Sequence, residues 1–261
     1  MKHGLFVTAF LIAIVAKTQD PGFTDTPMLP GLPYHVHDPA RPHPKVVTPG
    51  ELPGQPPSDA VVLFDGKDLS KWTGVRSGTA APWKIGNGYF EVVPRTGDIA
   101  TKDKFGDAQV HIEWMEPGDI QGTSQNRGNS GVYLMGLFEI QVLDSFMTPT
   151  YADGQAGAIY GQWPPLANAM RKPGEWQVYD IVFEAPRYQG DKLIKPAYMT
   201  VFLNGVLLHN HKDAMGPTVN RQLAKYKAGG PVDGPIVLQD HGSPVRFRNV
   251  WVRRPGTYDE L

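Results

Sequence analysis

Cysteine is absent from this chain of 261 residues, and its absence removes several kinds of chemistry. Without cysteine there can be no disulfide, no thiolate nucleophile, no thiolate metal site and no lipid-bearing cysteine. Stability must therefore come from a packed core, which a chain of this length can bury.

An excess of charge is also absent, because 25 Lys and Arg stand against 26 Asp and Glu, with no basic run. Proteins that hold nucleic acid or an anionic membrane by charge need a basic patch. We therefore expect neither as a partner. The sequence does not indicate which protein partners, if any, it has.

Long hydrophobic runs are lacking, and the most apolar stretch, from Leu5 to Ala16, is too short to cross a bilayer comfortably. It follows the basic Lys2 and precedes polar residues, which predicts a cleavable signal peptide over 1–16. Ile14 is bulky for a cleavage site after Ala16. We expect a secreted or periplasmic protein without a membrane anchor.

Proline is abundant between residues 17 and 59, and this predicts an extended N-terminal segment because proline cannot donate a ladder hydrogen bond. His35, His37 and His43 lie inside this segment. They could bind a metal, but such tracts are usually solvated.

Residues 60–254 form a region of short apolar or alternating runs separated by turn residues, and 255–261 form a C-terminal tail. This pattern is typical of an all-β domain. Asn87-Gly88 and Asn204-Gly205 predict tight hairpins. The predicted strands are 61–64, 83–93, 107–115, 130–135, 138–144, 175–185, 197–211, 235–240 and 245–254. We expect them to stack as two antiparallel sheets.

Alternation along these strands predicts which side chains share a face. Phe138, Ile140 and Val142 should face the core, which leaves Glu139 and Gln141 on the opposite face. In the last strand, Arg246 and Arg248 should share one face, and Phe247, Asn249 and Trp251 the other. Polar faces of this kind could bind sugar hydroxyls. They could also be solvated faces with cross-strand charge pairs.

Several stretches resemble, in the same order, the 3-keto-disaccharide hydrolase domain family of secreted bacterial proteins. They are LFDGKDLSKW (63–72), GNGYFEV (86–92), NSGVYL (129–134), FEIQVLDS (138–145), GAIYG (157–161), PGEWQVYDIVFEAPR (173–187), LNGVLLHN (203–210), GPT (216–218) and LQDHGSPVRFRNVWVR (238–253). Together they span nearly all of the β-rich region, and their number and order make the resemblance specific.

The resemblance implies a jelly-roll β-sandwich like that of concanavalin A-type lectins and glucanases. It also implies a carbohydrate substrate, cleaved as a glycoside oxidised to a ketone at sugar carbon 3. Such a ketone acidifies the hydrogen on carbon 2, so a positioned base can remove it and the glycosidic oxygen can leave. Addition of water then completes a net hydrolysis.

The stretch EIQVLD, residues 139–144, is similar to a catalytic strand motif of glucanases of this fold, with Glu139 first and Asp144 last. A bulge would be needed to bring Asp144 to the face of Glu139. Gln141 stands where that motif has its middle acid and cannot carry a proton. We therefore do not transfer the two-carboxylate retaining mechanism.

The candidate catalytic residues are Glu139, His241 and Asp144, and the candidate substrate-binding residues are Gln141, Gln239, Arg248, Arg246, Tyr133, Asn129, Glu113 and Trp163. Each has a structural alternative. Glu139 could pair with an arginine, Asp144 could cap the following turn, and His241 could stabilise its loop. Arg246, Arg248 and Glu113 could form surface ion pairs, and Trp163, like Trp83, could belong to the core.

No cofactor and no metal site is predicted, although a structural calcium ion stays open. His209 and His211 could ligate a metal, but an exposed hairpin end explains them better. Two other functions stay open. One is a non-catalytic carbohydrate-binding module, and the other is a glycosidase acting on unoxidised glycans.

Overall fold

The computed structural model describes residues 21–119 and 121–259, so the predicted signal peptide lies outside the described residues. The chain divides into two units, Met1–Val46 with Gly256–Leu261, and Val47–Pro255. The proline-rich segment is thus split, because residues 47–59 belong to the β-rich unit. No helix in the described part of the chain is long and apolar enough to span a membrane.

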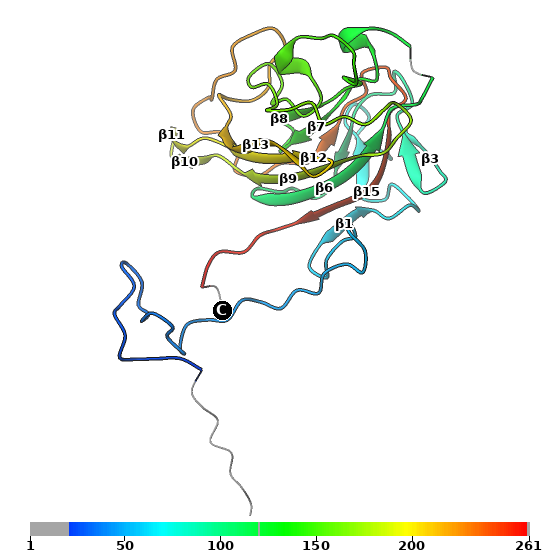
Figure 1. The fold of residues 1–261 in the computed structure, drawn as a ribbon. Coiled ribbons are helices and arrows are strands. Elements are labelled where there is room, and N and C mark those ends of the chain that lie inside the picture. The colour runs from blue at the N-terminus through cyan, green and yellow to red at the C-terminus, as the bar shows by residue number, and fades with distance from the viewer. Residues whose placement is uncertain (1–20, 120, 260–261) are drawn as a thin grey trace, which may run out of the picture. The chain divides into compact units, whose positions relative to one another are not determined.

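Two antiparallel sheets form the second unit (Figure 1). The eight-stranded sheet has the order β13 (Val206–Asp213), β12 (Tyr198–Leu203), β9 (Gln177–Glu184), β6 (Ala108–Met115), β15 (Arg246–Arg253), β4 (Tyr89–Glu91) and β3 (Lys84–Gly86), with β1 (Val61–Phe64) also paired to β15. The five-stranded sheet has the order β2 (Trp72–Gly74), β5 (Ile99–Thr101), β14 (Val237–Leu238), β7 (Ser130–Leu134) and β8 (Phe138–Val142). The predicted all-β jelly-roll sandwich is confirmed.

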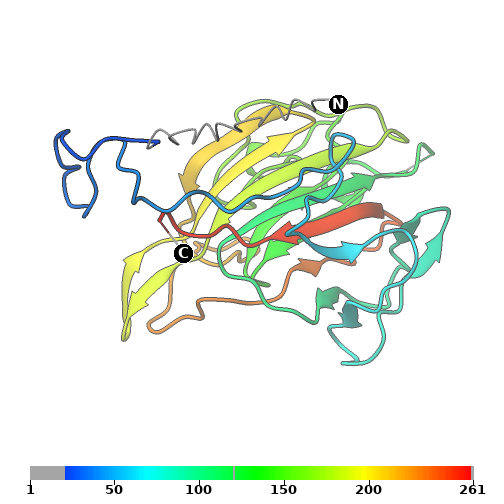
Figure 2. The same ribbon diagram turned by 90° about the horizontal axis from the view of Figure 1, so that it is seen from below.

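Smaller elements complete the fold. β10 (Arg187–Gln189) and β11 (Lys192–Lys195) form a separate two-stranded sheet, and the 3-10 turns η1 (Ser124–Asn126) and η2 (Ala152–Gly154) lie in loops beside β7 and β8. Figure 2 shows the strands of the large sheet side by side, with β1 next to β15.

Both predicted tight hairpins are confirmed by their backbone angles. Asn87 and Gly88 have φ of 53° and 77° between β3 and β4, and Asn204 and Gly205 have 53° and 81° between β12 and β13. Positive φ at both central residues matches the right-handed twist of the flanking strands, and asparagine and glycine tolerate it.

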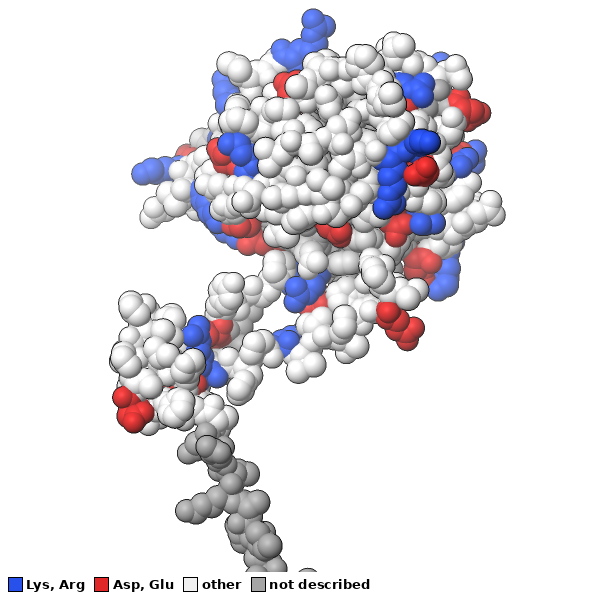
Figure 3. Space-filling view, in the orientation of Figure 1, with Lys and Arg blue, Asp and Glu red and all other residues white. Residues whose placement is uncertain are grey.

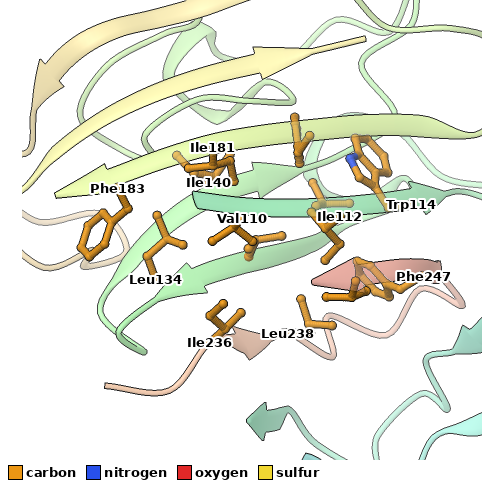
Figure 4. Packing of buried hydrophobic residues seen from close by; sticks show 14 of the residues in the cluster. Val110, Ile112, Trp114, Leu134, Ile140, Ile181, Phe183, Ile236, Leu238 and Phe247 are labelled. Carbon is orange, nitrogen blue, oxygen red and sulfur yellow. The ribbon is translucent and has the colours of Figure 1, made fainter. Parts of the chain in front are cut away.

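The core lies between the sheets, where alternation puts the apolar side of each strand (Figure 4). Phe138, Ile140 and Val142 of β8 are fully buried, as predicted. They meet the large sheet, where Phe138 contacts Phe183 at a ring distance of 5.7 Å. Trp83 is a core residue, as the structural alternative expected, and its ring stacks on that of Phe247.

The prediction that Asn249 and Trp251 share the face of Phe247 on β15 is wrong. A bulge at Asn249, which has φ of 44°, shifts the register between Arg248 and Trp251. The extra residue turns Asn249 to the outer side, where its amide donates to Glu113 Oε1 at 2.9 Å. Strict alternation fails here because a bulge places two residues opposite one.

We predict that Phe247→Ala lowers the free energy of unfolding by about 3–5 kcal/mol, because it leaves a cavity among stacked aromatic rings. Urea denaturation of Val182→Ala, on the exposed side of β9, is the matched control and should show a loss below about 1 kcal/mol. Equal losses in the two variants would contradict the assigned core.

Candidate functional site

Glu139 lies at the centre of a polar cluster on the outer face of the five-stranded sheet. It pairs across the ladder with Tyr133 of β7, and Gln141 pairs with Gly131. Tyr133 Oη donates to Glu139 Oε2 at 2.8 Å, and Gln239 Nε2 donates to Tyr133 Oη at 3.2 Å. The three strands β14, β7 and β8 therefore bring the predicted Gln239, Tyr133 and Glu139 together.

Glycine at position 131 makes room for the carboxylate. A Cβ atom there would lie 2.5 Å from Glu139 Oε1 and 2.9 Å from the Tyr133 ring. Any other residue would have to displace Glu139, because contacts this short are sterically forbidden. The small residue in NSGVYL thus has a role in shaping the site.

Amide side chains support Glu139 from its other side. The Gln141 amide lies 3.0 Å from Glu139 Oε1, and with its nitrogen turned toward the carboxylate it donates this hydrogen bond. In this orientation the Gln141 oxygen faces Gln125 Oε1, another acceptor, at 3.0 Å. Asn129 Nδ2 donates to Gln125 Oε1 at 3.4 Å, and Asn129 Oδ1 lies 3.4 Å from the Gln141 amide. The predicted Gln141 therefore hydrogen-bonds to Glu139, and the predicted Asn129 lies beside Gln141.

Three loops surround the polar cluster, so that this face of the sheet becomes the floor of a pocket. Residues 157–161 run along β8, with Tyr160 N donating to the Glu139 carbonyl at 3.1 Å. Thr218 Oγ1 accepts from Glu139 N at 3.0 Å. In Figure 1 the loops after β6 and β8 lie over β7 and β8, on the side away from the β9–β6–β15 sheet.

The resulting inner pocket has a volume of about 140 Å³ and is lined by Asn129, Tyr133, Glu139, Gln141, Tyr160, Thr218, Asn220, Gln239 and His241. Six of the eleven candidate site residues are among them. Tyr160, Thr218 and Asn220 were not predicted, although Tyr160 and Thr218 lie in the stretches GAIYG and GPT that carried the resemblance. Strand alternation could not find them because they lie on loops.

Glu139 is 3% exposed, and burial raises the pKa of its carboxyl to about 7, against the lowering effect of the Tyr133 hydrogen bond. Burial and the adjacent Glu139 raise the pKa of Tyr133. Desolvation disfavours a charged carboxylate, so Glu139 can both take up and release a proton near neutrality. Glu139 is the only carboxylate among the described residues that line the inner pocket.

An outer groove of about 870 Å³ adjoins the inner pocket, and Tyr160, Asn220 and His241 line both. It runs between residues 123–126, Tyr151 and Asp153, and residues 219–223. His241 is exposed at this junction. The two hollows therefore adjoin at these three residues, and Glu139 lines the inner pocket but not the outer groove.

Asp144 does not reach this pocket, so the predicted catalytic position is corrected. β8 ends at Val142, and Asp144 is completely buried, with Oδ2 accepting from Arg127 Nε at 2.5 Å. Its Oδ1 accepts from Phe146 N at 3.2 Å, as in the alternative of a turn cap. The bulge that would have turned it toward Glu139 is not formed.

Arg246, Arg248 and Glu113 are also corrected, because they lie on the eight-stranded sheet. Arg248 Nε donates to Glu113 Oε2 and Arg246 Nε to Glu91 Oε2, each at 2.6 Å. Hydrogen bonds from His111, Asn249 and Arg248 lower the pKa of Glu113 to about 2 against the raising effect of burial. The charges on this sheet neutralise one another across strands, as in the structural alternative.

Trp163 is placed outside the pocket as well. Its indole Nε1 donates to the Asp213 carbonyl at 2.8 Å, and Lys212 lies 3.5 Å above its ring. His209 and His211 do not converge on a metal, because His209 Nε2 lies 2.9 Å from the Gly157 carbonyl while His211 Nε2 lies 3.0 Å from Glu184 Oε1. The described residues contain no group of three or more His, Asp or Glu arranged for a metal ion.

Lys and Arg are interspersed with Asp and Glu on the face of the molecule seen in Figure 3. No patch of one sign dominates the described residues on that face.

Comparison with known proteins gives a family match and matches to several solved structures. The family model described as the 3-keto-alpha-glucoside-1,2-lyase-like domain matches residues 59–253. The chain is 48% identical to a candidate glycosyl hydrolase from Parabacteroides distasonis, with a TM-score of 0.79 and coverage of 87% of this chain and 100% of that one. No curated protein matches the chain.

Two further candidate glycosyl hydrolases from the same organism show the same fold at 22% and 24% identity, each with a TM-score of 0.55. The matches cover 76% and 75% of this chain and 94% and 99% of theirs. The family match covers most of the chain, over the β-rich region that carries the motifs. The chain therefore belongs to the 3-keto-alpha-glucoside-1,2-lyase-like domain family, as its motifs predicted, and is a carbohydrate-active protein.

Proposed function

We propose that this protein is a secreted enzyme that cleaves 3-keto-glycosides by removing the proton next to the ketone, with Glu139 as the base. The observation that carries the proposal is the buried carboxylate of Glu139, the only one among the described residues that line the inner pocket, with a pKa of about 7. A base is most effective when its pKa lies near the working pH.

The substrate's keto-sugar would occupy the inner pocket. Gln239 Oε1 is buried there without a hydrogen-bond partner among the described residues. A buried acceptor without a donor is costly, and a sugar hydroxyl would satisfy it. Asn129 and Thr218 supply further neutral groups that suit hydroxyls.

The reaction then proceeds by elimination. Glu139 takes the hydrogen of sugar carbon 2, and the electron pair moves onto the ketone oxygen as an enolate. When the carbonyl re-forms, a double bond forms between carbons 1 and 2, and the bond from carbon 1 to the glycosidic oxygen breaks. His241, at the mouth of the inner pocket, gives the departing oxygen a proton. Adding water to the unsaturated sugar would complete hydrolysis.

The paired-acid mechanism of ordinary glycosidases is less well supported. That mechanism needs two carboxyl groups flanking one bond. Glu139 is the only carboxylate among the described residues of the inner pocket, and the Asp144 carboxylate is paired with Arg127. The purified protein, incubated with a 3-keto-disaccharide, should release the second sugar. Sugar binding without release would favour a binding module.

We predict that Glu139→Gln lowers kcat/KM on a 3-keto-glycoside by about 100- to 10,000-fold, because the amide cannot accept the proton. For the wild type, the rising limb of the pH profile of kcat/KM should have its midpoint near 7, since the carboxylate is the active form of Glu139. Glu113→Gln, on the other sheet, is the matched control and should keep kcat/KM. Full activity of Glu139→Gln would refute the assigned base.

We predict that Tyr133→Phe moves that midpoint to higher pH. The Tyr133 hydrogen bond lowers the pKa of Glu139, so its removal leaves desolvation less opposed and raises this pKa. The measurement is the pH profile of kcat/KM, with Tyr198→Phe on β12 as the control. A midpoint that stays in place, or moves to lower pH, would contradict the coupling.

We predict that Asp144→Asn lowers the free energy of unfolding by about 3–5 kcal/mol, because it breaks a buried ion pair with Arg127. At a temperature where the variant is folded, kcat/KM should stay within a few-fold of the wild type. Thermal unfolding and single-temperature kinetics measure the two effects. Loss of activity without loss of stability would restore the paired-acid mechanism.

A further inference from the structure

The outer groove has a chemistry that differs from that of the inner pocket. The inner pocket is lined by amides, hydroxyls and one carboxylate, whereas the outer groove also exposes three large apolar or aromatic side chains. Leu223 is 91% exposed, Tyr151 46% and Val219 37%. Apolar side chains gathered in a groove beside a pocket are typical of a ligand site.

The groove is positioned to hold the part of the substrate that leaves. A keto-sugar with its carbon 2 at Glu139 would have its glycosidic bond at the junction, beside Tyr160, Asn220 and His241. Whatever is joined to the sugar then lies toward the outer groove, because that groove adjoins the inner pocket at these three residues. The volume of about 870 Å³ is large enough for a ring system.

The side chains at the junction can do little to protonate a poor leaving group as it departs. Among the described residues at this junction, His241 is the side chain proposed to give the departing oxygen a proton, and it is exposed to water. A phenol has a pKa near about 10, as in tyrosine, so its oxygen can depart as the anion. The hydroxyl of a second sugar is a much weaker acid and needs a proton as it leaves.

We propose that the outer groove is an aglycone site that prefers an aryl group, so that the favoured substrates are 3-keto-glycosides of phenols. This inference rests on the proposed function. The aryl ring lies against Leu223, Val219 and Tyr151, while the keto-sugar occupies the inner pocket. Burial of the ring and of these side chains removes apolar surface from water on both partners.

The first experiment measures binding without any reaction. Unoxidised phenyl glucoside and methyl glucoside are titrated into the full-length protein by calorimetry. The wild type should bind the phenyl glucoside about tenfold more tightly, because a ring buried on apolar side chains gains about 1.4 kcal/mol. In Leu223→Ser the ratio of the two affinities should fall toward one. Leu166→Ser, an apolar residue that is 73% exposed outside the groove, is the control and should keep the ratio.

The second experiment compares kcat/KM on the 3-keto forms of phenyl glucoside, methyl glucoside and a disaccharide. The phenyl substrate should be fastest, and Leu223→Ser should reduce its advantage over the methyl substrate. Cleavage of all three at equal rates, or a preference for the disaccharide, would overturn the aryl preference while leaving the proposed function intact. Phenyl-selective binding without cleavage of any substrate would overturn the proposed function but keep the aryl site.

Discussion

Everything at the site depends on the burial of one carboxylate. Glu139 stands on a strand whose other face carries Phe138 and Ile140 into the core, so its position is dictated by the packing of the sandwich. Loops then cover the carboxylate and remove it from water. The Tyr133 hydroxyl and the Gln141 amide donate to it in return, and this is too little to offset desolvation fully. Desolvation therefore raises the pKa of Glu139 to about 7, which suits acid–base chemistry at neutral pH.

The two outer faces of the sandwich differ in how their polar groups are satisfied. On the eight-stranded sheet, Arg248 and Glu113 pair across strands, and His111 lies 2.7 Å from Asp180. Burial would lower the pKa of His111, but these carboxylates raise it to about 9, so the cluster is charged and self-contained. On the five-stranded sheet the groups are mostly neutral, and one buried acceptor of Gln239 has no hydrogen-bond partner in the part of the chain that the structure describes. A ligand is favoured where polar groups still lack partners.

Backbone pairing extends the site beyond the strands. The segment 157–161 hydrogen-bonds along β8, and Thr218 joins Leu137 and Glu139 through its main chain and hydroxyl. These bonds hold Tyr160 and Thr218 at the pocket. Loops anchored in this way can vary the outer groove while the sheet keeps Glu139 in place.

The amino-acid sequence by itself determined most of the strands, both Asn-Gly hairpins, the core face of β8 and the family, because these depend on local alternation, turn chemistry and motif order. It missed the short strands β2, β5, β10 and β11. It also placed Glu139 and Gln141 on the face of β8 opposite the core. Only the tertiary structure decided which faces meet. Arg246 and Arg248 have the same alternation as the residues around Glu139 but belong to the other sheet, and Asp144 turns inward to Arg127 because the strand ends before it. Sheet membership and loop closure depend on contacts distant in sequence, which no local pattern records.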